Sequence, residues 1–208
     1  MTARWRAALD GGLGDRKTRM LGLLLIGLGA LGTIVMRDDA NFETVFVASL
    51  VAGSVLGRWW TVIVPMAILG IVEPVLWGGP YAIYSSHVIL GLTFFIVTGF
   101  LFVGIVGRRL KPRVVFRVKS IALLTTVSIP MTIAYDLWTD VGEYAFIASP
   151  MGLTFWNVLE AQVPFTLYHL LSSLIFVPLF GTGILMLHAL GWPHAEEETA
   201  PAEPSDES

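Results

Sequence analysis

Long apolar stretches, separated by short polar or glycine- and proline-rich breaks, dominate this chain. We predict six membrane-spanning helices, because each stretch holds enough apolar residues to cross roughly 30 Å of hydrocarbon. The second stretch is short, and we expect it to end in the membrane interface. The predicted spans cover residues 20–36, 42–57, 59–77, 82–106, 114–138 and 163–190.

Charged or turn-forming residues mark the breaks between these stretches. The Arg-Asp-Asp run at 37–39 ends the first span, Gly57 lies in the turn between the second and third, and the Gly-Gly-Pro run at 78–80 ends the third. Segment 139–162 is polar and contains glycine and proline, which predicts loops before the last span. We expect Pro164 in the first turn of that span, where proline is well tolerated.

Composition points to an integral membrane protein. Of the 208 residues, 55% are hydrophobic and 14% are charged, whereas soluble domains carry about 25% charged residues. We predict an all-α fold, a six-helix bundle over residues 20–190, between a basic N-terminal region at 1–19 and an acidic, disordered tail at 191–208. There is no cysteine, which excludes disulfides and thiolate chemistry.

The basic residues predict the orientation. Twelve of the 13 lysines and arginines fall in the N-terminal region, at Arg58, or between residues 108 and 119, and only Arg37 lies elsewhere. With six spans and a cytoplasmic N-terminus, all twelve lie on the cytoplasmic side, as the positive-inside rule requires. We therefore predict a multi-pass plasma-membrane protein with both termini in the cytoplasm.

The outer side then collects acidic, aromatic and histidine side chains that are candidates for binding a substrate. Glu73 and Asp136 stand out, because each lies in the last turns of an apolar span, where a carboxylate is costly unless it faces a cavity, a partner or the interface. The aromatic residues also fit an interfacial belt, and a buried histidine often bonds only a carbonyl or a serine. The candidates are Glu73, His87, Tyr135, Asp136, Trp138, Trp156 and His169.

We assign provisional roles to the candidates. Asp136 would bond or charge-pair with the substrate, His169 would be a hydrogen-bond partner, and Trp138 and Trp156 would stack on a ring. Acids outnumber bases on the predicted outer side, which favours a neutral or cationic ligand. Aromatic rings beside carboxylates suit a cationic heteroaromatic compound in particular.

Small residues line parts of the first two spans at helical spacing. Ser49, Gly53 and Gly57 are four residues apart, and the first span carries Gly22, Gly29, Gly32 and Thr33. Such residues let helix backbones approach closely in lipid. Two interpretations remain open, namely packing within the bundle and a contact surface for a partner subunit.

The sequence indicates no enzyme. It contains no nucleotide-binding lysine loop and no H-E-x-x-H metal motif. Ser54 and His169 are expected near opposite membrane surfaces, which argues against an intramembrane serine hydrolase. We predict no catalytic site, no metal, no cofactor and no nucleic-acid partner.

Four stretches together resemble the substrate-binding S components of energy-coupling-factor (ECF) transporters. They are the arginine-flanked, glycine-rich residues 19–33, the stretch 48–60 with an AGxxxG turn, residues 64–74 with a proline and an outer-end acid, and residues 165–176 with a polar stripe. The resemblance covers about residues 19–190.

The resemblance implies a six-helix protein that captures a vitamin-like micronutrient outside the cell. It also implies two partners, a transmembrane coupling subunit and a pair of cytosolic ATPases. The family contacts its coupling subunit through an Ala-x-x-x-Ala surface on the first span, and the nearest match here is Gly29-x-x-x-Thr33, with Gly22 and Gly32 nearby. A stand-alone secondary transporter or channel, and a membrane scaffold that transports nothing, remain alternatives.

Overall fold

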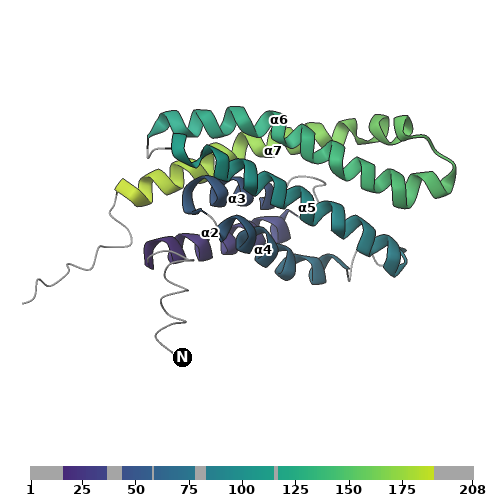
Figure 1. Ribbon diagram of the computed structural model, residues 1–208, viewed down its shortest axis with the longest axis horizontal. Helices are drawn as coiled ribbons and strands as arrows, with labels where there is room; N and C mark the ends of the chain where they lie inside the picture. The colour runs from purple at the N-terminus through teal and green to yellow at the C-terminus, as the bar shows by residue number, and fades with distance from the viewer. Residues whose placement is uncertain (1–15, 37–43, 58, 78–82, 115–116, 190–208) are drawn as a thin grey trace, which may run out of the picture.

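A computed structural model describes residues 16–36, 44–57, 59–77, 83–114 and 117–189. Within these ranges the chain folds into helices joined by short turns, without a strand (Figure 1). The predictions for residues 1–15 and for the acidic tail lie outside the described residues. The helical elements are α2 (Arg16–Val35), α3 (Val45–Val51), η1 (Ala52–Leu56), α4 (Trp60–Trp77), α5 (Ser86–Leu110), η3 (Lys111–Arg113), α6 (Val118–Glu143), η4 (Tyr144–Ala148), η5 (Ser149–Met151) and α7 (Phe155–Ala189).

The predicted all-helical fold is confirmed for the described residues, and so are apolar helices of membrane-spanning length. Four of the described helices, α2, α5, α6 and α7, are long and apolar enough to cross a membrane, whereas Val45–Leu56 and Trp60–Pro74 are shorter apolar helices. Large apolar side chains such as Leu23, Leu90 and Leu167 are more than 60% exposed. An apolar outer surface of this kind is what a lipid environment accommodates.

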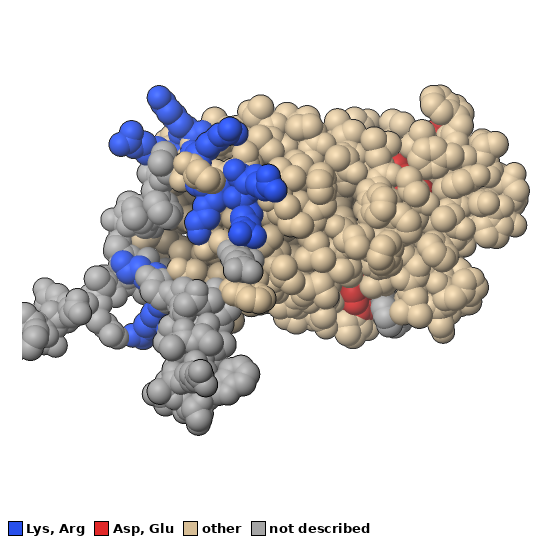
Figure 2. All heavy atoms as spheres, in the orientation of Figure 1, with Lys and Arg blue, Asp and Glu red and all other residues tan. Residues whose placement is uncertain are grey.

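Charge is separated along the long axis of the molecule. The described lysines and arginines gather at one end, where α2 begins, α5 ends and α6 begins (Figure 2). The acidic side chains in view lie in the opposite half. The basic clusters that are far apart in the sequence therefore share one end of the fold.

The short segment formed by α3 and η1 lies inside the bundle. Every residue of α3 is buried, and so are four of the five residues of η1. A helix that is apolar all round has no face suited to water and belongs in a core. At 1.5 Å per residue, Val45–Leu56 is about 18 Å long, too short for the hydrocarbon core, so the second predicted span forms a central helix.

Glycines allow the neighbouring helix α5 to approach this segment closely. A Cβ added at Gly53 would lie 2.1 Å from the carbonyl oxygen of Gly104, and one at Gly107 would lie 2.4 Å from that of Leu50. Both distances are far below van der Waals contact, so only glycine fits at this separation. The small residues predicted on the second span are used for packing within the bundle.

The turn predicted at Gly57 is confirmed. Gly57 has a φ of 112°, a conformation that other residues rarely adopt, and it separates η1 from α4. Lys111 caps the C-terminus of η1, because its ammonium group donates a hydrogen bond of 2.8 Å to the Leu56 carbonyl. A cation at a helix C-terminus is favourable both as a donor and as a charge.

The loops predicted over residues 139–162 are wrong, because most of this segment is helical. α6 continues to Glu143 and then through η4 and η5 to Met151, and α7 begins at Phe155 rather than near Pro164. Pro164 lies inside α7, as lipid-embedded helices tolerate when neighbouring groups satisfy the backbone. α7 has 35 residues, or about 52 Å, which exceeds the hydrocarbon thickness.

Local sequence signals explain where α7 begins. Gly152 has a φ of 75° and ends η5. The Thr154 hydroxyl then accepts a hydrogen bond from the Asn157 backbone N–H, while the Asn157 side chain accepts one from the Thr154 N–H. This reciprocal pairing is a capping box with asparagine in the third helical position, a short motif that the apolar pattern does not reveal.

The close approach of α5 to α3 can be tested with alanine at Gly107. The added methyl group would overlap the Leu50 carbonyl, and we expect a loss of about 1–3 kcal/mol of stability, measured as a lower unfolding temperature of the purified protein in detergent. Gly70→Ala is the matched control, because nothing lies within 4 Å of its added Cβ. Equal stability of both variants would contradict the packing described here.

Candidate functional site

A cavity of about 360 Å³ opens in the half of the molecule away from the basic end. Its wall comes from α2, α3, α4, α5, α6, η4 and α7, so residues far apart in the sequence meet around it. Such a volume suits a small molecule. The lining residues are Thr33, Val45, Leu69, Val72, Glu73, Tyr84, Leu92, Phe95, Ile96, Phe100, Tyr135, Asp136, Thr139, Asp140, Glu143, Ile147, Gln162, Phe165 and Thr166.

Three carboxylates of α6 line the cavity together. Asp136, Asp140 and Glu143 are spaced four and three residues apart, which places them on one face of a helix. Glu73 contributes a fourth carboxylate from α4. None of the described lining residues is lysine or arginine, so the described part of the cavity wall is acidic.

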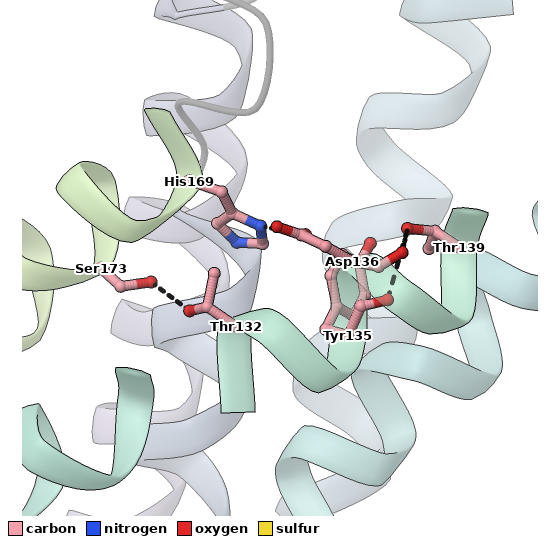
Figure 3. A network of polar contacts seen from close by, with 6 residues as sticks. All are labelled: Thr132, Tyr135, Asp136, Thr139, His169 and Ser173. Atoms are coloured by element: carbon pink, nitrogen blue, oxygen red, sulfur yellow. Dashed lines mark hydrogen bonds and ion pairs between the residues drawn. The ribbon is translucent and has the colours of Figure 1, made fainter. Parts of the chain in front are cut away.

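Asp136 forms a buried pair with His169 (Figure 3). The Asp136 Oδ1 atom and the His169 Nδ1 atom are 2.7 Å apart, and both side chains are almost completely buried. The histidine donates its Nδ1–H to the carboxylate in this arrangement, and charge-assisted bonds of this kind are stronger than neutral ones. His169 does not line the cavity, so it holds Asp136 in place from behind.

Aromatic rings enclose this pair. The His169 ring packs edge-on against Phe46 of α3, with centroids 5.1 Å apart, and against Tyr135, at 5.4 Å. Tyr135 stacks on Phe100 of α5, with centroids 4.6 Å apart. The rings position the histidine and separate it from solvent, which strengthens its bond to Asp136.

The same face of α6 and α7 carries further polar contacts. Thr132 and Ser173 are 2.9 Å apart through their hydroxyl groups, one turn from the Asp136–His169 pair (Figure 3). At the cavity wall, Gln162 donates a hydrogen bond to Glu143. These pairs fix the register of the two antiparallel helices, because sliding either helix would separate them all.

Two atoms of the buried pair have no hydrogen-bond partner among the described residues, Asp136 Oδ2 and His169 Nε2. Buried polar atoms without a hydrogen-bond partner are rare in folded proteins and often mark a functional site. Within the described ranges, no group of three histidine, aspartate or glutamate side chains is arranged to hold a metal ion.

The structure brings together some of the predicted site residues. Glu73, Tyr135 and Asp136 line the cavity, and His169 supports Asp136 directly behind the wall. The sequence predicts both Asp136 and His169 on the outer side, and the two side chains are in direct contact. Their role in binding stays a prediction.

Three other predicted residues lie away from the cavity. His87 is exposed in the first turn of α5 and contacts Ser85 at 3.0 Å. Trp138 is exposed on α6 and donates a hydrogen bond of 2.9 Å to Thr98. Trp156 is 64% exposed. Trp138 lies two residues after Asp136 on the continuous helix α6, so the two side chains point in different directions, and Trp138 contacts α5. Neither tryptophan lines the cavity, so the predicted stacking role does not apply to a molecule bound there.

Asp140, Glu143 and Gln162 are among the polar cavity residues that the sequence does not predict as site residues. The sequence predicts loops over residues 139–162, where polar side chains are expected to face solvent. Asp140 is only 6% exposed. The spacing of 136, 140 and 143 was the available signal, since acids three and four residues apart share one face of a continuing helix.

The small residues of α2 are covered by the chain itself. An added Cβ at Gly22 would meet the ring of Trp60, and one at Gly29 would meet Ile68. Gly32 lies against Thr44, and Thr33 is buried and donates a hydrogen bond to the Gly29 carbonyl. These four residues therefore pack against α4 and the start of α3, as the interpretation of packing within the bundle expects. Contact of this face with a partner subunit stays a prediction.

Together, the fold and the cavity define an all-helical protein with membrane-length apolar helices and an acidic cavity near one end. Residues 15–194 match the model of a family described as a family of unknown function (DUF6580), and this chain belongs to that family. No curated protein and no solved structure matches the chain.

The buried Asp136–His169 pair can be tested by removing one or both partners. His169→Leu leaves a buried carboxylate without its donor, and we expect it to cost about 3–5 kcal/mol of stability. The double change Asp136→Leu with His169→Leu removes both polar groups and should cost less than the single change. Chemical unfolding in detergent measures both, and a double variant less stable than His169→Leu would contradict the pairing.

Proposed function

We propose that this chain is the substrate-capture membrane subunit of an ECF-type importer, taking up a vitamin-like micronutrient from the outer side of the membrane. The observation that carries the proposal is the cavity of about 360 Å³ with its acidic and aromatic wall. Apolar side chains there bury a ring or chain, and a few polar groups fix its orientation. The four carboxylates favour a neutral or cationic compound over an anionic one.

The separation of charge supports the orientation in this proposal. The described basic side chains gather at one end, and the cavity lies in the other half. With the basic end in the cytoplasm, as the positive-inside rule favours, the cavity faces the outside of the cell. We retain six helical segments between the two sides of the membrane, the second of which is the short central helix Val45–Leu56, with both termini in the cytoplasm and the plasma membrane as the location.

The chain would capture the compound, and partners would supply the energy. We assign ATP hydrolysis to a pair of cytosolic ATPases and the transmission of movement to a coupling membrane subunit. Since Gly22, Gly29, Gly32 and Thr33 pack within the chain, the coupling subunit would contact a different surface. This departs from the contact that the family resemblance implies.

Native mass spectrometry of the purified protein tests capture directly, because a retained small molecule adds a defined mass. Uptake of that molecule into cells should then stop when the ATPase subunits are deleted. Transport by the chain alone in proteoliposomes would instead support a secondary carrier. Absence of any bound molecule, with unchanged uptake, would support a scaffold.

Filling the cavity provides a test with a matched control. Leu92 of α5 lines the cavity, so Leu92→Trp should occupy its space and lower retention of the bound molecule at least about tenfold, the effect of losing about 1.4 kcal/mol of binding free energy. Leu90→Trp adds the same bulk two residues away at a position 65% exposed, and should leave retention unchanged. Equal retention by both variants would argue against this cavity as the capture site.

A further inference from the structure

Two neighbouring carboxylates have hydrogen-bonding capacity that the described part of the chain leaves unused. Asp136 uses Oδ1 for His169, and its Oδ2 has no partner although the side chain is only 4% exposed. Asp140 is 6% exposed, and its carboxylate accepts no hydrogen bond from the described residues. Both side chains line the same cavity.

This arrangement is unfavourable without a further group. A buried carboxylate needs hydrogen-bond donors to replace the water it has lost. Asp136 and Asp140 are one helical turn apart on one face, so their charges also repel each other. A positively charged donor held between them would satisfy both requirements.

The described residues offer no such group at this place. Lysine and arginine are absent from the described lining, and His169 reaches Asp136 only from behind the wall. The described acids and histidines are not arranged to hold a metal ion. An organic cation therefore fits this place better than a metal ion does.

The need for donors narrows the kind of cation. A primary ammonium or an amidinium group carries several N–H donors and can bond two carboxylates at once. A quaternary ammonium has charge but no N–H, so it would leave the carboxylate oxygens without donors. The aromatic residues Phe95, Phe100 and Tyr135 border the same cavity and suit an apolar or ring portion next to the charge.

We infer that the captured compound carries a cationic nitrogen group with at least two N–H donors, bound by Asp140 and Asp136 Oδ2, with its apolar portion against the aromatic wall. This inference rests on the proposed capture function and names the chemical class of its ligand. Asp140 is the principal contact, and His169 is a positioning residue that orients Asp136.

Four probes of similar size separate charge from donor capacity. Benzamidine and benzylammonium have both, trimethylphenylammonium has charge alone, and benzamide has donors without charge. Isothermal titration with the full-length protein in detergent should show that the first two bind at least about tenfold more tightly than the others, the effect of a charge-assisted hydrogen bond. Equal or tighter binding of benzamide or trimethylphenylammonium, or no binding of benzamidine and benzylammonium at millimolar concentration, would overturn the inference.

A pair of isosteric variants locates the contact. Asp140→Asn should weaken benzamidine binding about tenfold or more, while the protein keeps its unfolding temperature, because Asp140 accepts no hydrogen bond from the described chain. Glu160→Gln is the control, since Glu160 does not line the cavity and bonds to Trp156 on the exposed side of α7. Unchanged binding to the Asp140→Asn variant would overturn the assignment of this residue.

The cation site and the proposed importer role can fail independently of each other. If benzamidine binds as expected but cellular uptake does not depend on the ATPases, the cation site stands and the importer role fails. If native mass spectrometry identifies a retained anionic compound whose uptake needs the ATPases, capture stands and the cation class fails.

Discussion

Burial of α3 on all sides is the constraint around which the bundle is built. A helix without a free face must be surrounded by neighbours, and these neighbours have to come close to its backbone to leave no voids. The glycines at 53 and 107 make that approach possible, because a methyl group at either position would overlap a backbone carbonyl or its neighbours. The long outer helices are thereby arranged around a short central one.

The length of the central helix also relates to the position of the cavity. α3 begins at Val45, which lines the cavity, while α6 and α7 continue past this level. The longer helices form walls around space beyond the first turn of the central helix. The site is therefore a consequence of unequal helix lengths, and its residues come from the ends of helices that are distant in the sequence.

Polar side chains between α6 and α7 are paired along most of their interface, and the exception lies at the cavity. Thr132 with Ser173 and Glu143 with Gln162 satisfy each other. At Asp136 only one carboxylate oxygen is satisfied by the chain. Buried polar groups are stabilising when fully paired and costly when not, so an incomplete pair next to a cavity distinguishes this place from the rest of the interface.

The apolar pattern of the sequence determined that the chain is helical and suited to a membrane, and it located the break at Gly57, because length and hydropathy are local properties. It also placed Asp136 and His169 on the same predicted side of the membrane. Tertiary structure decided that the helix continues through Asp140, since this acid is accommodated by a cavity whose wall comes from six other elements. It decided equally that the small residues of α2 face the chain itself, because which neighbour covers a helix face depends on packing between distant segments rather than on spacing within one.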